Sequence, residues 1–184
     1  MKHKNKPHIM LYNAVFPPFM LIFLIPTLLI ISLIGNFIID SIVLVIISFY
    51  IYKKINLHFY GKKIFGVWSL GFLADTIGNG YLIAVSLLSG ATYYEGNNLW
   101  RQILSGIYIA VNHSVYDSFG GFSFWGFLFL LSGVIISGVL IFIFDYLFIF
   151  NDLSITKKQR IVSSLIFAII TAPYTFLLPK ELFP

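Results

Sequence analysis

The sequence contains no cysteine and few charged residues. The absence of cysteine excludes disulfide bonds, thiolate metal sites and cysteine nucleophiles. Only 10% of the 184 residues are Asp, Glu, Lys or Arg, whereas a soluble domain carries about a quarter. Because 59% of the residues are hydrophobic, much of the surface has to face lipid. No stretch of about ten residues alternates between apolar and polar positions, which disfavours a transmembrane barrel.

The chain also lacks the short motifs of several enzyme classes. It contains no P-loop, no HExxH, no Gly-x-Ser-x-Gly and no dinucleotide-binding fingerprint. We therefore expect no cofactor and no bound metal, and an enzyme is the less favoured class. The net charge of +5 does not indicate nucleic acid as a partner, because the basic residues form short clusters between apolar runs, where they act as topology signals.

The apolar runs predict one all-helical, polytopic membrane domain over residues 1–184. A spanning helix needs about 20 apolar residues, and five stretches reach or approach that length: 17–34, 37–52, 64–88, 122–150 and 161–178. Pro26 lies inside the first stretch and predicts a helix kink. Gly35 and Asn36 form a turn signal, so we expect the first two spans to form a tight antiparallel hairpin. Asp40 then falls in the first turn of the second span, where a carboxylate complements the helix N-terminus; a functional role at the outer mouth is the alternative.

Residues 98–119 differ from these stretches because their apolar side chains share one helical face. Leu99, Ile103 and Ile107 lie on that face, and Arg101 and Asn112 lie on the opposite side. This pattern is typical of a helix in the plane of the membrane interface. A re-entrant segment is the second interpretation, and a sixth full span is the third.

The distribution of basic residues supports five spans with a cytoplasmic N-terminus. In this layout ten basic residues lie in inner segments: Lys2, Lys4, Lys6, Lys53, Lys54, Lys62, Lys63, Lys157, Lys158 and Arg160. Only two, Arg101 and Lys180, lie outside, as the positive-inside rule requires. The preference for Lys, Ile, Phe and Asn over Arg and Ala indicates an AT-rich bacterial genome. We therefore expect a multi-pass protein of the bacterial cytoplasmic membrane.

The third predicted span carries an aspartate near its middle. Asp75 and Asn79 are one helical turn apart, on a stripe of mostly small and polar residues that should face the bundle interior. Ionisable groups at that depth are costly and commonly functional. Because no other predicted span carries a basic residue, Asp75 is expected to be protonated, hydrogen-bonded or paired with a bound cation. The pair therefore predicts a ligand or ion site; interhelical hydrogen bonds that lock helix packing are the alternative.

An aspartate on the fourth span and a polar cluster before it are two further candidate features. Asp145 lies about two turns from the inner end of the fourth span, and an ion pair with Lys157 or Lys158 is the favoured interpretation. Asn112, His113 and Asp117 belong to the densest polar cluster, expected at the outer surface as an interfacial cluster or external gate. His113 and Asp117 could alternatively serve a lipid-modifying enzyme, but their acid–base set is incomplete.

Small residues four apart on the fourth span, represented by Gly133 and Ser137, predict a close-packing helix face.

The leading hypothesis for function is a small transport-type membrane protein with a buried polar substrate or cation site on the third span. The lipid bilayer is its expected surrounding, and active transport would need an ion gradient or a separate energising subunit. The alternative is a non-catalytic accessory, immunity or assembly protein whose docking surface is the Ser132–Gly138 face.

Overall fold

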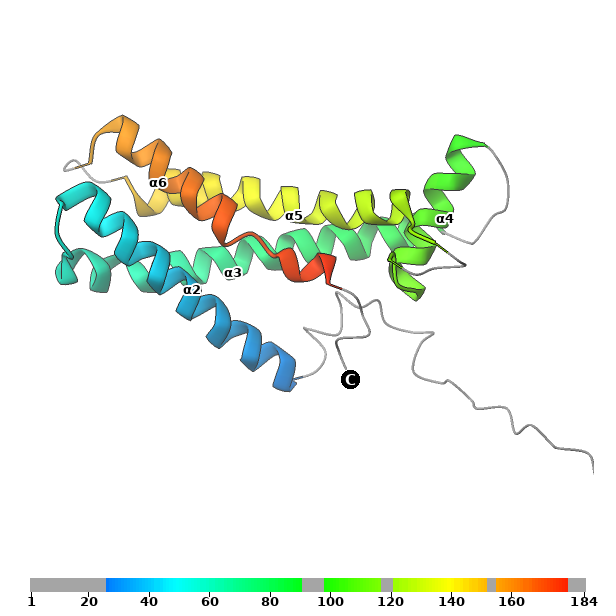
Figure 1. Cartoon of the computed structure of the whole chain (residues 1–184), viewed down its shortest axis with the longest axis horizontal. Coiled ribbons are helices and arrows are strands. Elements are labelled where there is room, and N and C mark those ends of the chain that lie inside the picture. Colours follow the sequence, from blue (N-terminus) through cyan, green and yellow to red (C-terminus); the bar gives the residue numbers. More distant parts are fainter. Residues whose placement is uncertain (1–25, 91–97, 117–120, 152–154, 179–184) are drawn as a thin grey trace, which may run out of the picture.

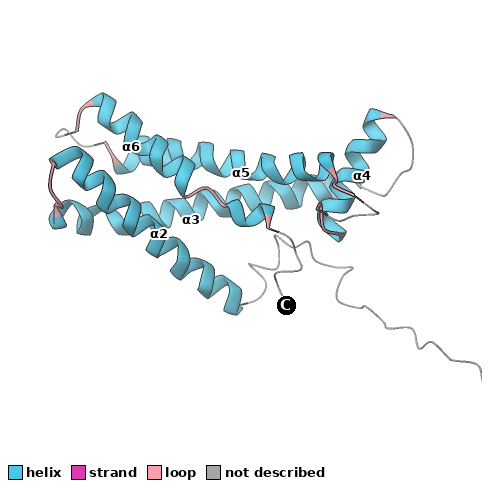
Figure 2. Cartoon of the chain, viewed as in Figure 1, coloured by secondary structure: helices cyan, strands magenta, loops and turns pink. Residues whose placement is uncertain are grey.

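The computed structural model describes residues 26–90, 98–116, 121–151 and 155–178. Every regular element in these residues is a helix (Figures 1 and 2). The elements are α2 (Pro26–Tyr52), α3 (Leu57–Leu88), α4 (Leu99–Asn112), α5 (Phe124–Phe144), the π-helix η1 (Asp145–Ile149), α6 (Lys157–Ile170) and the 3-10 helix η2 (Tyr174–Leu177). The side chains of residues 26–28 are not part of the description.

Four helical stretches of the described residues are long and apolar enough to cross a membrane. They are Leu29–Tyr52, Leu57–Leu88, Phe124–Ile149 and Lys157–Leu177. The prediction of an all-helical membrane protein is thereby confirmed in its class. Long α3 and α5 lie side by side in opposite directions, α2 crosses α3 obliquely, and α6 packs on the second half of α5 (Figure 1).

The predicted hairpin between the first two spans is wrong. α2 runs without interruption from Pro26 to Tyr52, through Gly35 and Asn36. A turn at this point would expose backbone polar groups to lipid, and the intact helix satisfies them internally. Pro26 is the first residue of α2, a position that tolerates proline. The predicted kink depends on residues 17–25, which lie outside the described residues and make up half of the predicted first span.

α4 lies across the end of the bundle where α3 ends and α5 begins (Figure 1). Asn98 begins it, since its side-chain oxygen accepts a hydrogen bond from the Trp100 amide at 2.9 Å. The helix has 14 residues, and at 1.5 Å per residue it is about 21 Å long. A bilayer core is about 30 Å thick. The sixth full span is therefore excluded for this helix, whose polar and apolar faces fit the predicted amphipathic pattern.

Small residues bring α3 and α5 into close contact. A Cβ atom at Gly78 would collide with the Ser137 hydroxyl oxygen and lie 3.0 Å from the Gly133 carbonyl oxygen. The Ser137 hydroxyl also donates a hydrogen bond to the Ala74 carbonyl at 3.3 Å. α4 crosses the start of α5 in a similar way, because a Cβ atom at Gly106 would lie 2.7 Å from the Gly126 nitrogen. These contacts fix α3 against α5 along the middle of the molecule.

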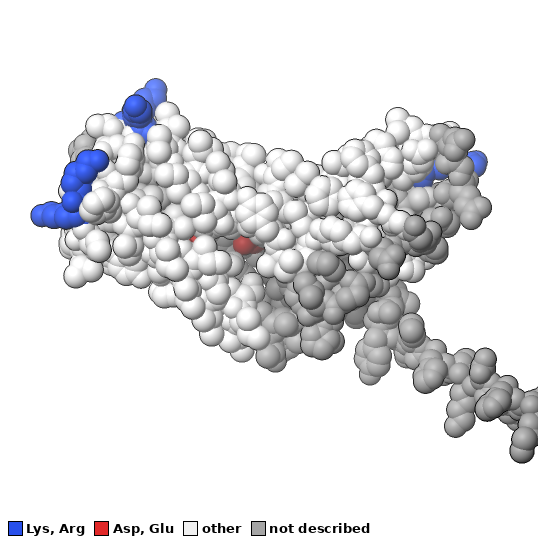
Figure 3. Space-filling view, viewed as in Figure 1, with Lys and Arg blue, Asp and Glu red and all other residues white. Residues whose placement is uncertain are grey.

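Basic side chains gather at the ends of the helices. Figure 3 shows basic residues at the end where the α2–α3 connection and the start of α6 lie, and again near α4 at the opposite end. The first group comprises Lys53, Lys54, Lys62, Lys63, Lys157, Lys158 and Arg160, and the described basic residue of α4 is Arg101. Between these two ends the described part of the visible face shows no basic side chain and only small acidic areas.

Candidate functional site

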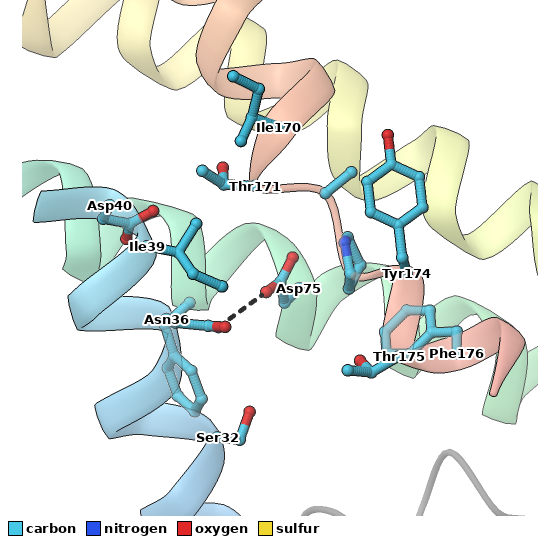
Figure 4. Close-up of a pocket in the computed structure, with 13 residues that line it drawn as sticks. Ser32, Asn36, Ile39, Asp40, Asp75, Ile170, Thr171, Tyr174, Thr175 and Phe176 are labelled. Atoms are coloured by element: carbon cyan, nitrogen blue, oxygen red, sulfur yellow. Dashed lines mark hydrogen bonds between the residues drawn. The ribbon is translucent and has the colours of Figure 1, made fainter. Parts of the chain in front are cut away.

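A pocket of about 160 Å³ opens between α2, α3 and the segment that joins α6 to η2. Figure 4 shows its polar side chains facing one another from these three elements. The lining residues are Ser32, Asn36, Ile39, Asp40, Phe72, Asp75 and the run 170–176. Asp75 comes from near the middle of α3 and Asp40 from near the middle of α2, so two carboxyl groups share the pocket at the centre of the bundle.

α2 contributes a polar stripe to this pocket. Ser32, Asn36 and Asp40 are spaced four residues apart, which places them on one face of the helix. Asp40 is 4% exposed. Across from it, α3 carries Gly71, where a Cβ atom would lie 3.8 Å from an Asp40 carboxylate oxygen. Asp40 is thus buried where α2 packs against this part of α3.

Asp75 is only partly satisfied by the protein. It is 7% exposed, and its Oδ2 atom accepts a hydrogen bond from Asn36 Nδ2 at 3.4 Å (Figure 4). Its Oδ1 atom is buried and has no hydrogen-bond partner. Buried polar groups normally find a partner, and an exception calls for an explanation such as an ion or a water molecule. The unpartnered Oδ1 atom makes Asp75 a candidate ligand for such a group.

Asn79 lies one turn beyond Asp75 and is buried as well. Its side-chain oxygen also lacks a hydrogen-bond partner, but Asn79 is not among the residues that line the pocket. Sequence analysis proposed Asp75 and Asn79 as one site; the structure brings Asp75 together with Asn36 and Asp40 instead, and places Asn79 beside the pocket.

The third wall of the pocket is a break in a helix. α6 ends at Ile170, and Pro173 follows before η2 starts at Tyr174. Proline lacks an amide hydrogen and disfavours helical conformation in the residue before it, which explains the break. The Thr171 hydroxyl donates to the Phe167 carbonyl at 3.0 Å. The C-terminal end of α6, which carries a partial negative charge, thus lies at the pocket wall.

The pocket is lined by two acidic residues, Asp40 and Asp75. Every described lysine or arginine belongs to the outer turns of the spans, the connection between α2 and α3, or α4. Two carboxyl groups and a helix C-terminus therefore meet in an apolar bundle without a basic side chain from the described residues, an arrangement that suits a cation or a proton.

The other predicted residues lie away from this pocket. Asn112 ends α4, and its Nδ2 atom donates a hydrogen bond to the Tyr108 carbonyl oxygen at 3.0 Å. His113 follows as the C-cap, with its ring centroid 5.7 Å from that of Tyr108. Asp117 lies outside the described residues, so the structure does not test a His113–Asp117 pair. Gly133 and Ser137 are buried against α3 of the same chain.

The predicted ion pair of Asp145 is wrong for the described residues. Asp145 is 2% exposed and its Oδ2 atom has no hydrogen-bond partner. Lys157 and Lys158 occupy the exposed first turn of α6. A capping box between Thr156 and Gln159 fixes the start of this helix, and the two lysines on its first turn remain at the bundle surface.

Sequence reasoning missed Asn36 and Thr171 and assigned Asp40 to a helix terminus. The available signal was the four-residue spacing of Ser32, Asn36 and Asp40, which only becomes a helical stripe if the Gly35–Asn36 turn is not formed.

No family model matches the chain, and neither the curated proteins nor the solved structures contain a match. The fold and the pocket by themselves define an all-helical protein whose four apolar helices suit a multi-pass membrane protein.

Proposed function

We propose that this protein is a transport-type membrane protein that binds a small cation in the Asp40–Asp75 pocket. The observation that carries the proposal is the buried Asp75 Oδ1 atom, which lacks a hydrogen-bond partner while a second carboxyl group, Asp40, lines the same pocket. A bound cation would satisfy both groups and offset their mutual repulsion.

The broken helix α6 supports the same proposal. Many secondary transporters bind ions near the middle of the membrane at discontinuous helices, where helix C-terminal ends and unwound carbonyl groups serve as ligands. Here the break between Ile170 and Tyr174 lines the pocket. The basic end of the bundle is the cytoplasmic end by the positive-inside rule, and the membrane in this proposal is the bacterial cytoplasmic membrane.

The size of the pocket limits the ligand. Its volume of about 160 Å³ corresponds to roughly five water molecules at about 30 Å³ each. A metal ion with a few waters or a small amine fits this space, whereas a large substrate does not. The lining adds Phe72, Tyr174 and Phe176, and aromatic rings also attract cations.

Thermal unfolding of the purified protein in detergent tests this proposal. Unfolding is followed in NaCl, KCl, methylammonium chloride or N-methylglucamine chloride at equal ionic strength. A cation that binds only the folded state at ten times its Kd adds about 1.4 kcal/mol of stability. We expect at least one of the first three salts to raise the unfolding temperature relative to the bulky N-methylglucamine.

Asp75→Asn should abolish this stabilisation because it removes the charge while keeping the shape of the side chain. The matched control is Thr76→Val, the next residue on α3, which is exposed and points away from the pocket; it should respond to the salts as the wild type does. A wild type that responds to none of the three salts, or an Asp75→Asn variant that responds fully, contradicts the proposal.

A further inference from the structure

A second hollow lies between α2 and the start of α3. It is an open groove of about 290 Å³, lined by Ser41, Ile42, Val45, Ile46 and Tyr60. The first four residues belong to α2 and the last belongs to the first turn of α3. None of the five lines the cation pocket, so the groove is a separate feature of the surface.

The hydroxyl groups in the groove already donate to partners within the protein. The Tyr60 hydroxyl donates a hydrogen bond to Ser41 Oγ at 3.1 Å, and the Ser41 hydroxyl donates to the Phe37 carbonyl at 2.6 Å. The rest of the lining is aliphatic, and Ile42 and Ile46 are 56% and 55% exposed. A polar ligand would lose hydrogen bonds to water here without replacing them, whereas a hydrocarbon chain would not.

A positive charge lies at one end of the α2 face that forms this groove. Ile42, Ile46 and Tyr50 are spaced four residues apart, so they follow one another along that face. The Lys53 ammonium nitrogen lies 5.8 Å from the centroid of the Tyr50 ring, within the range of a cation–π contact. Lys53 is therefore placed over the aromatic ring that comes directly after Ile46.

The length of this face matches one leaflet of a bilayer. The Lys53 amide still donates to the Phe49 carbonyl at 2.9 Å, so the helical rise continues to this residue. Ile42 and Lys53 are 11 residues apart, which is about 16.5 Å along the axis at 1.5 Å per residue. Half of the hydrocarbon core is about 15 Å. An acyl chain in the groove would thus reach the lysine with its headgroup.

The charged residues around Lys53 are basic. Lys54 follows it and is exposed, the first two turns of α3 carry Lys62 and Lys63, and Figure 3 shows basic side chains gathered at this end of the bundle. The acidic residues of the described ranges are Asp40, Asp75 and Asp145, and all three are buried. The described residues therefore offer no exposed carboxylate to neutralise this end.

We propose that the groove holds an acyl chain of an anionic phospholipid, and that Lys53 and Lys54 bind the phosphate of its headgroup. Clusters of lysine and arginine beside a membrane span attract anionic lipids. A zwitterionic lipid offers the same chains, but its headgroup carries no net charge for the lysines to offset. The basic end is cytoplasmic by the positive-inside rule, so the lipid belongs to the cytoplasmic leaflet. This inference does not depend on the cation site.

Native mass spectrometry of the purified, delipidated protein tests the proposal. The protein in a mild detergent is titrated with palmitoyl-oleoyl phosphatidylglycerol or with phosphatidylcholine that carries the same chains. The wild type should bind its first phosphatidylglycerol about tenfold more tightly than phosphatidylcholine, because two lysines contribute to the headgroup site.

Two double variants separate a site from general attraction between charges. Lys53→Gln combined with Lys54→Gln should remove most of the preference for phosphatidylglycerol and leave phosphatidylcholine binding unchanged. Lys157→Gln combined with Lys158→Gln is the matched control. It removes the same charge from exposed positions at the start of α6, at the same end of the bundle, and should keep the preference.

Filling the groove gives a test that does not alter any charge. Ile46→Trp places a larger side chain in the groove and should weaken the binding of both lipids. Ile31→Trp is the control, since Ile31 is another exposed residue of α2, at 61%, and lies outside the groove. Because both side chains are exposed at the surface of the bundle, both variants should fold.

Three results would overturn the proposal. Equal affinity of the wild type for the two lipids would remove the headgroup site. Equal losses in the two double-lysine variants, or full lipid binding by Ile46→Trp, would show that the basic end attracts anions without using the groove. A delipidated protein that binds neither lipid and forms a stable dimer would assign this face to a second copy of the chain.

Discussion

Gly78 offers the sharpest test of how α3 is held against α5. A methyl group at this position would collide with the Ser137 hydroxyl oxygen and lie 3.0 Å from the Gly133 carbonyl oxygen. The first of these atoms can move with its side chain, but the second belongs to the backbone of α5. Overpacking of this kind costs about 1–3 kcal/mol, so Gly78→Ala should lower the free energy of unfolding by that amount.

Gly80 provides the matched control, because it lies on the same helix and a Cβ atom there meets nothing within 4 Å. Alanine in an open helical position is favoured over glycine by about 0.5–1 kcal/mol. The two substitutions should therefore have opposite signs and differ by about 1.5–4 kcal/mol. The free energies are measured by SDS titration in mixed micelles, with helix content followed by circular dichroism.

A double variant identifies the colliding atom. Ser137→Gly alone should cost about 0.5–1.5 kcal/mol, because it removes the hydrogen bond to the Ala74 carbonyl. Combined with Gly78→Ala, it should cost less than the sum of the two single changes, by about 0.5–3 kcal/mol. Equal effects of Gly78→Ala and Gly80→Ala, or strict additivity in the double variant, would refute the close α3–α5 contact.

Three further changes test the site and the ends of the helices. Asn36→Leu removes the hydrogen bond to Asp75 and should change the Kd of the stabilising cation by at least threefold without preventing folding; an unchanged Kd would contradict a role for Asn36 in the pocket. Arg160→Lys keeps the charge but loses the planar stacking on Tyr146. It should therefore destabilise the protein by about 0.5–2 kcal/mol in the same SDS titration. If this variant is as stable as the wild type, the stacking is unimportant. Thr156→Ala removes the capping box of α6 and should cost about 1 kcal/mol, whereas Thr156→Ser should restore most of this loss.

Much of the architecture could be predicted from local patterns. The low charge content and long apolar runs define an all-helical membrane protein, because a backbone in lipid must satisfy its hydrogen bonds internally. The amphipathic period of residues 98–119 predicted a helix, and α4 covers residues 99–112 of this segment. Asp75 could be identified because a carboxyl group in an apolar run is costly wherever the helix lies.

The limits of the sequence appear at Gly35 and Asn36. In water these residues favour a turn, but within α2 the cost of an unsatisfied backbone in lipid outweighs that local preference. Once the helix continues, Asn36 becomes the hydrogen-bond partner of Asp75, and Asp40 moves from a helix end to the middle of a span. A local turn preference therefore concealed two residues of the pocket.

The sequence by itself determined the class of the protein, its basic clusters and the depth of Asp75, since each follows from composition or spacing along one helix. The tertiary structure decided which carboxyl groups meet. Asp40 and Asp75 line one pocket because α2 packs against α3, and the break of α6 at Pro173 supplies the third wall of that pocket. Asp145 lies apart from its neighbouring lysines because the start of α6 holds them at the surface. These relations join residues 12 to 133 positions apart, and they are set by helix packing, which no local pattern encodes.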